Sequence, residues 1–269
     1  MLKRYNSFVK RINESNESDE SFINDVPNNE VKKFNAMTDY TLLEPSATED
    51  NILELSEKAR IIEPKSICIL PKMVKFVKEV LKDTNILICT VISFPEGTNS
   101  LEEKVKETEK ALSDGADEID MVLDYQKLLE NWDDQTQSLD KKEHDYLLQD
   151  IKQLADLCHK QGKILKVIVE SGELDIPQTK YVTTLCIDGG ADYIKTSTGK
   201  VDIGAELDKV KVMNETITEE GSDLLIKASG GIRTIDDQRK FFPFVQRFGV
   251  GSGSVDNING LTQYKKENY

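Results

Sequence analysis

The sequence predicts a single (β/α)8 barrel from its length, from the alternation of strand-like and helix-like segments, and from the number of strand-like runs. The chain has 269 residues, and barrels of this class typically occupy about 250 residues as one unit. Eight short runs rich in β-branched and apolar residues follow from Asp39 onward, nearly all separated by helix-length segments. This alternation is typical of parallel strands covered by helices.

Taken in order, the segments support this α/β assignment. The helix-like segments carry start signals: Thr48 or Ser46 precedes acidic residues of the first helix, and Pro71 suits the first position of the second. A further long helical region is predicted from 123 to about 159. A doubly wound open sheet is the alternative, but no GxGxxG follows the first run. The predicted strands are 40–43, 66–70, 86–93, 116–123, 163–170, 191–197, 224–229 and 247–252.

The predicted barrel occupies residues 39–258. Residues 1–38 are rich in Asn, Ser, Asp, Glu and Lys, and we interpret them as an N-terminal extension with room for one short helix. Residues 259–269 form a C-terminal tail. No Pro/Gly/Ser linker or alignable repeat divides the barrel region.

Charge and hydropathy exclude several classes of function. With 35 Lys+Arg against 49 Asp+Glu, the net charge of -14 disfavours nucleic-acid and membrane-surface partners, and we find no basic patch. The longest apolar stretches, such as 86–92, are shorter than the roughly 20 residues of a spanning helix. The N-terminus has no apolar run typical of a secretory signal, so we expect a cytoplasmic protein. Cysteines without CxxC spacing and histidines without HExxH spacing predict no metal site.

Four charged residues interrupt strands that should be buried: Asp120, Lys166, Lys195 and Lys227. Burying an isolated ion costs several kcal/mol, so these residues need partners or a function. One interpretation is an ion-pair network that only balances itself. The other is a catalytic site, because inward side chains of different barrel strands converge and catalytic groups lie at the carboxyl ends of strands.

Position separates the three lysines. Lys195 and Lys227 immediately precede loops and should lie near the mouth of the barrel, whereas Lys166 is followed by four more residues of its run and should lie deeper. A lysine in an apolar pocket beside a second cation is pushed toward its neutral form, which attacks carbonyl groups. Asp120 supplies a carboxylate that can relay protons through a bound water. The set predicts an aldolase that forms a Schiff base and needs no metal or other cofactor.

Two glycine-rich loops, 229–234 and 249–254, follow the last two runs. Backbone N–H groups in such loops can bind an anion, and phosphate sites are common after strands 7 and 8 of barrels. Thr198, Gly199 and Lys200 provide a third loop with hydroxyl, backbone and ammonium donors. Ordinary tight turns remain the alternative. We predict a small phosphorylated substrate.

These motifs together resemble the deoxyribose-phosphate aldolase family. In family order the chain contains DYTLLEP, TVISFPEG, GADEIDMV, LKVIVESGEL, ADYIKTSTGK, KASGGIRT and RFGVGS, from Asp39 to Ser252. The resemblance implies a (β/α)8 barrel that reversibly cleaves 2-deoxy-D-ribose 5-phosphate to acetaldehyde and D-glyceraldehyde 3-phosphate. It also suggests a homodimer or another homo-oligomer, and a role in deoxyribonucleotide catabolism and carbohydrate degradation.

The resemblance assigns roles by position. Lys195 matches the Schiff-base lysine, Lys227 the second lysine that keeps it neutral, and Asp120 the proton-relay aspartate. Supporting roles are suggested for Lys166, as a charge partner of Asp120 or Glu170, and for Asp39, Cys68 and the terminal Tyr269. The substrate and phosphate region corresponds to Thr198, Gly199, Lys200, Gly230, Gly231, Gly249, Gly251 and Ser252.

Some positions depart from the family pattern. Gly251 stands where many relatives have Ser, which leaves only a backbone N–H for the phosphate, and Tyr40 and Glu44 are assigned no role. Two other functions remain open. A sugar-phosphate isomerase would share the phosphate loops but use a Glu/His pair, and no His occurs at a predicted strand end. A non-catalytic phosphosugar-binding barrel would use its lysines only to neutralise the ligand.

Overall fold

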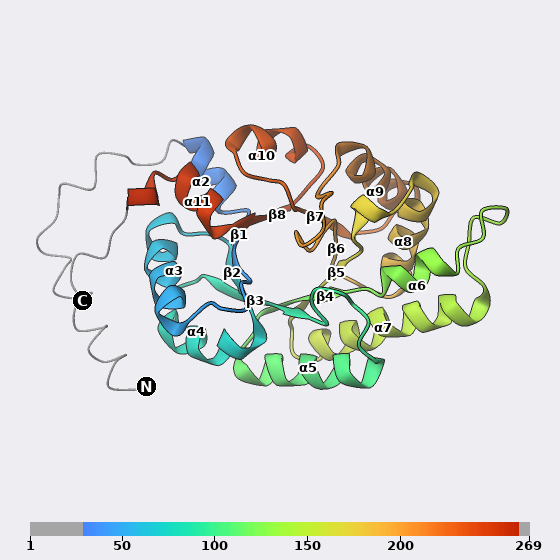
Figure 1. Ribbon diagram of the computed structural model, residues 1–269, viewed down its shortest axis with the longest axis horizontal. Coiled ribbons are helices and arrows are strands. Elements are labelled where there is room, and N and C mark those ends of the chain that lie inside the picture. Colours follow the sequence, from blue (N-terminus) through green and yellow to red (C-terminus); the bar gives the residue numbers. More distant parts are fainter. Residues whose placement is uncertain (1–28, 264–269) are drawn as a thin grey trace, which may run out of the picture.

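In the computed structural model, which describes residues 29–263, eight parallel strands close into a barrel in the order β1 to β8 (Figure 1). This confirms the predicted fold class. Each strand lies within its predicted run, except that β1 already starts at Thr38. The strands are β1 (Thr38–Leu42), β2 (Ser66–Ile69), β3 (Leu87–Ile92), β4 (Glu118–Val122), β5 (Ile164–Ile168), β6 (Tyr193–Lys195), β7 (Leu225–Ser229) and β8 (Arg247–Gly251).

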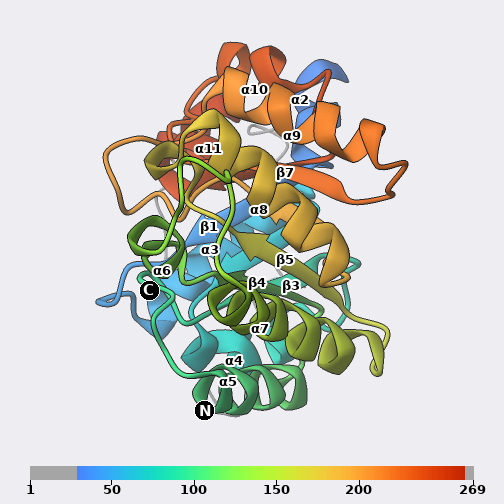
Figure 2. The same cartoon turned by 90° about the vertical axis from the view of Figure 1, so that its right-hand side faces the viewer.

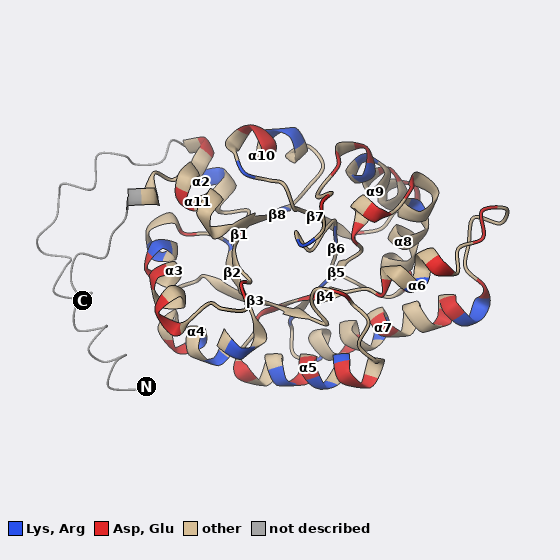
Figure 3. Ribbon diagram, viewed as in Figure 1, with Lys and Arg blue, Asp and Glu red and all other residues tan. Residues whose placement is uncertain are grey.

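Helices surround the ring of strands (Figure 1), and the view turned by 90° shows them packed along its outside (Figure 2). Acidic and basic residues are interspersed over these outer helices (Figure 3). The helices are α2 (Asn29–Asn35), α3 (Glu49–Ile62), α4 (Val74–Val80), α5 (Leu101–Asp114), α6 (Tyr125–Glu130), α7 (Lys141–His159), α8 (Ile176–Asp188), α9 (Leu207–Glu219), α10 (Ile235–Phe241) and α11 (Ser252–Ile258), with short 3₁₀ turns at Pro71–Met73, Ser171–Glu173 and Leu261–Gln263.

Side-chain caps fix where the helices start. Thr48 accepts a hydrogen bond from the Asn51 N–H at the start of α3, and Ser100 and Thr234 form equivalent reciprocal capping boxes at α5 and α10. Pro71 does begin a helical segment, but as a 3₁₀ turn that continues into α4. The caps at α3, α5 and α10 mark where the loops before these helices end.

The predicted continuous helical region from 123 to 159 is wrong. Two helices, α6 and α7, are separated by a polar excursion in which Asp133 pairs with Ser138 in an isolated antiparallel bridge. Asp140 then caps α7 by accepting hydrogen bonds from the Lys142 and Glu143 N–H groups. The short polar side chains of this segment favour turns and caps over continued helix.

The N-terminal extension is described from residue 29 onward. Its helix α2 packs Phe34 edge-to-face against Phe242 and Phe248, with ring centroids 5.6 and 5.8 Å apart. Glu30 of α2 also pairs with Arg239 of α10. Residues 1–28 and 264–269, including Tyr269, lie outside the described residues. Among the described helices, none combines the length and apolar character needed to cross a membrane.

Candidate active site

Seven charged side chains meet inside the barrel, and we call them the buried charge cluster. They come from six strands because alternate residues of a strand point inward. Counted with its backbone, none of the seven residues is more than 3% exposed. The cluster consists of Asp39 on β1, Glu118 and Asp120 on β4, Lys166 on β5, Lys195 on β6, Lys227 on β7 and Arg247 on β8.

Asp120 connects the three lysines predicted from the sequence. Its Oδ2 atom accepts hydrogen bonds from Lys195 Nζ at 2.8 Å and Lys227 Nζ at 2.7 Å, and its Oδ1 atom accepts one from Lys166 Nζ at 2.8 Å. Burial alone would raise the pKa of Asp120, but the three ammonium groups outweigh burial and hold it well below its usual value. The carboxylate is therefore ionised and bridges all three lysines.

The lysines lie at different depths. Lys195 is the last residue of β6 and the most accessible of the three, with 4% of its side chain exposed, whereas the side chains of Lys166 and Lys227 are fully buried. Lys166 is paired in register with Tyr193 and Asp120, further from the mouth than Lys195. The prediction that Lys166 lies deeper is confirmed. Lys195 is the amine that a molecule entering from the mouth can reach.

Sequence reasoning missed the lower part of the cluster. Arg247 donates to Asp39 Oδ1 at 2.5 Å and to both oxygens of Glu118 at 2.8 and 3.0 Å. Lys166 pairs with Asp120 at 2.8 Å and with Glu118 at 2.6 Å, and its ion pairs do not include Glu170. The predicted partnership with Asp120 therefore holds, and Glu118 is a further partner. Charged residues inside predicted strand runs were the available signal for Glu118 and Arg247 as well.

The seven members of the cluster comprise four basic groups and three carboxylates. Burial disfavours the charges on Lys166, Lys227 and Arg247, but the neighbouring carboxylates outweigh burial and raise the pKa of each. Lys227 contacts Asp39 as well as Asp120. These three basic groups equal the three carboxylates in number, and Lys195 is the fourth basic group of the cluster.

We expect Arg247→Met to unfold at a markedly lower temperature than the wild type. The substitution removes a cation that pairs with both Asp39 and Glu118 inside the barrel, which should cost about 3 kcal/mol and lower Tm by roughly 10 °C. Arg239→Met is the matched control because Arg239 pairs with Glu30 on an exposed surface, where water screens the interaction. Scanning calorimetry measures both, and equal shifts in Tm would contradict a structural role for the buried pairing.

Cys68, a predicted supporting residue, lies on β2 in register with Cys89 on β3. Cys89 donates to Asp120 Oδ1 at 3.1 Å, and Lys166 Nζ lies 3.4 Å from its sulfur. Cys68, Cys89 and Asp120 are close enough to share a metal ion. However, three ammonium groups already contact the Asp120 oxygens, which disfavours a divalent cation there.

The loops predicted to bind phosphate lie side by side at the mouth. Gly230 has a φ of 82°, and a Cβ there would come within 2.9 Å of Gly204 Cα, so the loops after β6 and β7 pack backbone against backbone. The Ala205 N–H donates to the Gly230 carbonyl at 3.0 Å. A Cβ on Gly249 would come within 3.2 Å of Lys227 Cε. Small residues here keep both the loops and Lys227 in place.

Two residues of the predicted phosphate region are held by carboxylates. The Thr198 N–H and hydroxyl donate to buried Glu170, with the hydroxyl at 2.5 Å. Burial raises the pKa of Glu170 despite these hydrogen bonds. Lys200 Nζ lies 2.9 Å from Glu44 Oε1, at the edge of the mouth. Glu170 thus anchors the loop after β6, and Glu44 is a competitor for any anion that approaches Lys200.

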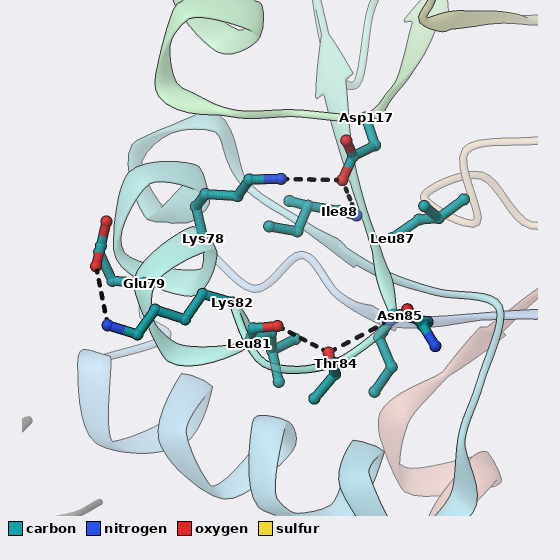
Figure 4. A pocket seen from close by; sticks show the side chains of 10 residues that line it. Lys78, Glu79, Leu81, Lys82, Thr84, Asn85, Leu87, Ile88 and Asp117 are labelled. Atoms are coloured by element: carbon teal, nitrogen blue, oxygen red, sulfur yellow. Dashed lines mark hydrogen bonds and ion pairs between the residues drawn. The ribbon is translucent and has the colours of Figure 1, made fainter.

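A surface pocket lies at the opposite end of the barrel, beside the amino ends of β3 and β4 (Figure 4). Its charged side chains are already paired: Lys78 Nζ lies 3.5 Å from Asp117 Oδ2, and Lys82 Nζ lies 3.9 Å from Glu79 Oε2. Catalytic groups of barrels lie at the carboxyl ends of strands. We therefore place the candidate active site at the mouth beside Lys195.

Comparison with known proteins identifies a family for the chain. The model of the DeoC/LacD family aldolases matches residues 34–253. A deoxyribose-phosphate aldolase of Metamycoplasma hominis is 41% identical over 210 residues, which cover 78% of this chain and 89% of that protein. One from Clostridium botulinum is 40% identical over 205 residues, covering 76% and 89% respectively.

Solved structures share the barrel. A protein of Coccidioides immitis superposes with a TM-score of 0.78 at 31% identity, covering 96% of this chain and 98% of that one. The tetrameric deoxyribose phosphate aldolase of Aeropyrum pernix superposes with a TM-score of 0.72 at 25% identity, covering 87% and 92%. The family model covers most of the barrel, and the two relatives named above are 41% and 40% identical to this chain. The chain therefore belongs to the DeoC/LacD family of aldolases.

Proposed function

We propose that this protein is a class I aldolase that reversibly cleaves 2-deoxy-D-ribose 5-phosphate to acetaldehyde and D-glyceraldehyde 3-phosphate through a Schiff base on Lys195. The observation that carries the proposal is the shared contact of Lys195 and Lys227 with one oxygen of buried Asp120 at the mouth of the barrel. Relatives named for this activity support the choice of substrate.

Lys195 is the nucleophile in this proposal. Loss of its proton leaves three basic groups against three carboxylates in the buried charge cluster, so neutralising Lys195 balances the charge. The permanent charge of Lys227 on the same carboxylate oxygen disfavours a second ammonium ion beside it. The neutral amine attacks C1 of the open-chain sugar, and the carbinolamine takes up a proton on its hydroxyl and loses water to give a protonated Schiff base.

Cleavage then follows from the electron demand of the Schiff base. The C2–C3 bond breaks, its electron pair forms an enamine on C2, and the C3 hydroxyl loses its proton to Asp120 through a water molecule. The three-carbon aldehyde phosphate leaves. Protonation of C2 and hydrolysis of the Schiff base release acetaldehyde and restore Lys195.

The phosphate is proposed to bind at the carboxyl ends of β6, β7 and β8. Thr198, Gly199 and Lys200 follow β6, and Gly230 and Gly231 follow β7. The predicted loop 249–254 is instead strand followed directly by helix: Gly249 and Gly251 lie at the end of β8, and Ser252 is the first residue of α11. Backbone N–H groups and the Lys200 ammonium group provide donors for an anion. Since Gly251 has no hydroxyl, its backbone N–H is the donor at that position.

The isomerase alternative is disfavoured by the positions of the histidines. The sequence has two, and both lie on α7, outside the barrel, where His144 contacts Tyr181 at 2.7 Å and His159 contacts Asp192 at 2.9 Å. Neither can form a Glu/His acid–base pair at the mouth.

The direct test supplies purified protein with 2-deoxy-D-ribose 5-phosphate and follows acetaldehyde and glyceraldehyde 3-phosphate. The proposal predicts equal amounts of both products. A parallel incubation with ribose 5-phosphate, which has the C2 hydroxyl that isomerisation needs, tests the isomerase. Its conversion to a ketose, with no cleavage of the deoxy sugar, would support the isomerase, and saturable binding of the deoxy sugar phosphate without turnover would support the binding protein. Either outcome would overturn the aldolase.

Lys227→Leu should lose cleavage activity near pH 7 but retain formation of the reduced acetaldehyde adduct at higher pH. Lys227 keeps its proton through Asp120 and Asp39, and its charge is what favours neutral Lys195 at pH 7. Without Lys227, neutral Lys195 appears only when the solution itself removes the proton. The measurement is the pH profile of adduct formation by intact mass.

The matched control for this profile is Lys104→Leu. Lys104 is equally buried but pairs with Asp150 between α5 and α7, far from the cluster in the fold. It should lower stability without moving the pH profile. An unchanged profile for Lys227→Leu would remove Lys227 from the mechanism.

The proposal extends to the organisation and setting of the protein. We propose that residues 39–258 form the aldolase barrel, flanked by the extension 1–38 and the tail 259–269. A homo-oligomer is supported by the tetrameric relative from Aeropyrum pernix. A cytoplasmic protein acting in deoxyribonucleotide catabolism fits the proposed substrate, and size-exclusion chromatography with light scattering would measure the oligomeric state.

A further inference from the structure

Two cysteines face each other inside the barrel, next to the buried charge cluster. Cys68 of β2 and Cys89 of β3 are register partners in a parallel pair, so their side chains point to the same face of the sheet. Both are fully buried, and their sulfur atoms lie within 4.8 Å of each other and of an Asp120 oxygen. The mechanism proposed above uses neither thiol.

We propose that Cys68 and Cys89 form a reversible disulfide when the protein meets hydrogen peroxide, and that this bond switches off catalysis at Asp120. The loss of activity rests on the proposed function, whereas formation of the bond does not. The two cysteines and their neighbours form a site of covalent modification inside the barrel.

The backbone spacing permits the bond but strains it. Adjacent parallel strands lie about 4.7–4.9 Å apart, within the Cα separation of about 4.4–6.8 Å found for disulfides. The two sulfur atoms lie within 4.8 Å of each other, whereas a disulfide bond is about 2.05 Å long. The cysteine side chains and their strands must therefore shift toward each other to form the bond. Strained disulfides are reduced more readily, so thiols should reverse the modification.

The two cysteines have different roles in the reaction: Cys68 reacts with the peroxide, and Cys89 then forms the disulfide. A hydrogen bond with Cys89 lowers the pKa of Cys68 despite its burial, whereas burial raises the pKa of Cys89. The Cys68 thiolate attacks one peroxide oxygen and becomes a sulfenic acid as hydroxide leaves. Cys89 sulfur then displaces hydroxide from the sulfenic acid, and its thiol proton completes a water molecule. Together, two thiols and one peroxide give one disulfide and two waters.

The bond would disturb Asp120 directly. The Cys89 thiol donates to Asp120 Oδ1 at 3.1 Å, and a disulfide has no S–H to donate. Closing the gap between the sulfurs also pulls Cys89 toward β2 and away from the carboxylate that contacts Lys195 and Lys227. Because a displacement of about 1 Å in a catalytic group can cost about 100-fold in rate, we expect kcat to fall about 10- to 100-fold.

The experiment treats the purified protein with hydrogen peroxide, blocks the remaining thiols and records intact mass, linked peptides and activity. We expect the intact mass, recorded before the thiols are blocked, to fall by two hydrogen atoms, a peptide to link Cys68 to Cys89, and activity to be lost. Dithiothreitol should restore both the original mass and the activity. Cys89→Ala should instead gain one oxygen atom at Cys68. Each variant's treated activity is compared with its own untreated value.

The matched control is a double variant, Cys158→Ala with Cys186→Ala. These cysteines lie on the outer helices α7 and α8, and their loss should leave the peroxide response unchanged. Oxygen addition at Cys68 in the wild type without a linked peptide would overturn the disulfide. A linked peptide with full activity would overturn its effect on Asp120. The mass readout stands whether or not the proposed aldol cleavage is correct.

Discussion

Replacing Lys195 by methionine is expected to lower kcat/KM for 2-deoxy-D-ribose 5-phosphate by at least about 10⁴-fold. The substitution removes the amine that forms the covalent bond between enzyme and substrate in the proposed mechanism. Methionine has nearly the length of lysine and carries no charge, so it fills the same space at the end of β6. Its loss of charge leaves three basic groups against three carboxylates in the cluster, which is the balance proposed for the active wild type. The variant should therefore fold with a Tm close to that of the wild type.

The control for Lys195→Met is Lys180→Met. Lys180 lies on α8, with 58% of its side chain exposed, and pairs with Glu219. It should keep full activity. If Lys195→Met retained more than about one hundredth of wild-type activity, a different residue would have to carry the covalent step.

Asp120→Asn is expected to lower kcat by about 10²- to 10⁴-fold, the usual range for a lost acid–base group. It should also lower stability at pH 7 by about 3 kcal/mol, since three buried lysines lose a shared carboxylate. The loops after β6 and β7 and the end of β8 are untouched, so the phosphate end should still bind. Binding of 2-deoxyribitol 5-phosphate, which cannot form a Schiff base, measures this by calorimetry.

The pH dependence of the stability difference tests the same residue. The folded pKa of Asp120 is lowered, so its contribution to stability is complete above its unfolded pKa of about 3.9 and is lost as the pH falls toward the folded value. The difference in stability between wild type and Asp120→Asn should thus shrink below about pH 4.

Asp150→Asn is the matched control for Asp120→Asn, because Asp150 pairs with buried Lys104 outside the barrel interior. It should lose stability while kcat changes little. If Asp120→Asn lost binding of the sugar phosphate analogue in parallel with activity, Asp120 would have a structural role and not a proton-relay role.

The barrel and its strands were predictable because buried parallel strands leave a strong sequence pattern. The same pattern exposed Asp120, Lys166, Lys195 and Lys227 as charges that need an explanation, and the structure brings all four together. The order of depth followed from counting residues between each lysine and the end of its run. These inferences needed only the periodicity of a strand and the closure of a barrel.

Other features depend on contacts between distant segments. The pairing of Arg247 with Glu118 joins residues from β8 and β4, and the local sequence of either strand does not predict which residue it pairs with. Cys89 is a small residue in an apolar run, and only the register with Cys68 reveals the thiol pair. The break between α6 and α7 depends on local turn and cap contacts of polar residues, such as the bridge between Asp133 and Ser138, which a search for helix-length segments between strands does not detect.

The central claim is that Lys195 forms a Schiff base, and reductive trapping tests it most directly. The protein is incubated with acetaldehyde and sodium borohydride, and its intact mass and tryptic peptides are measured. The account predicts the mass of one ethyl group, added on the peptide that contains Lys195 and absent in Lys195→Met. No stable adduct, or an adduct that persists on another lysine in Lys195→Met, would contradict it.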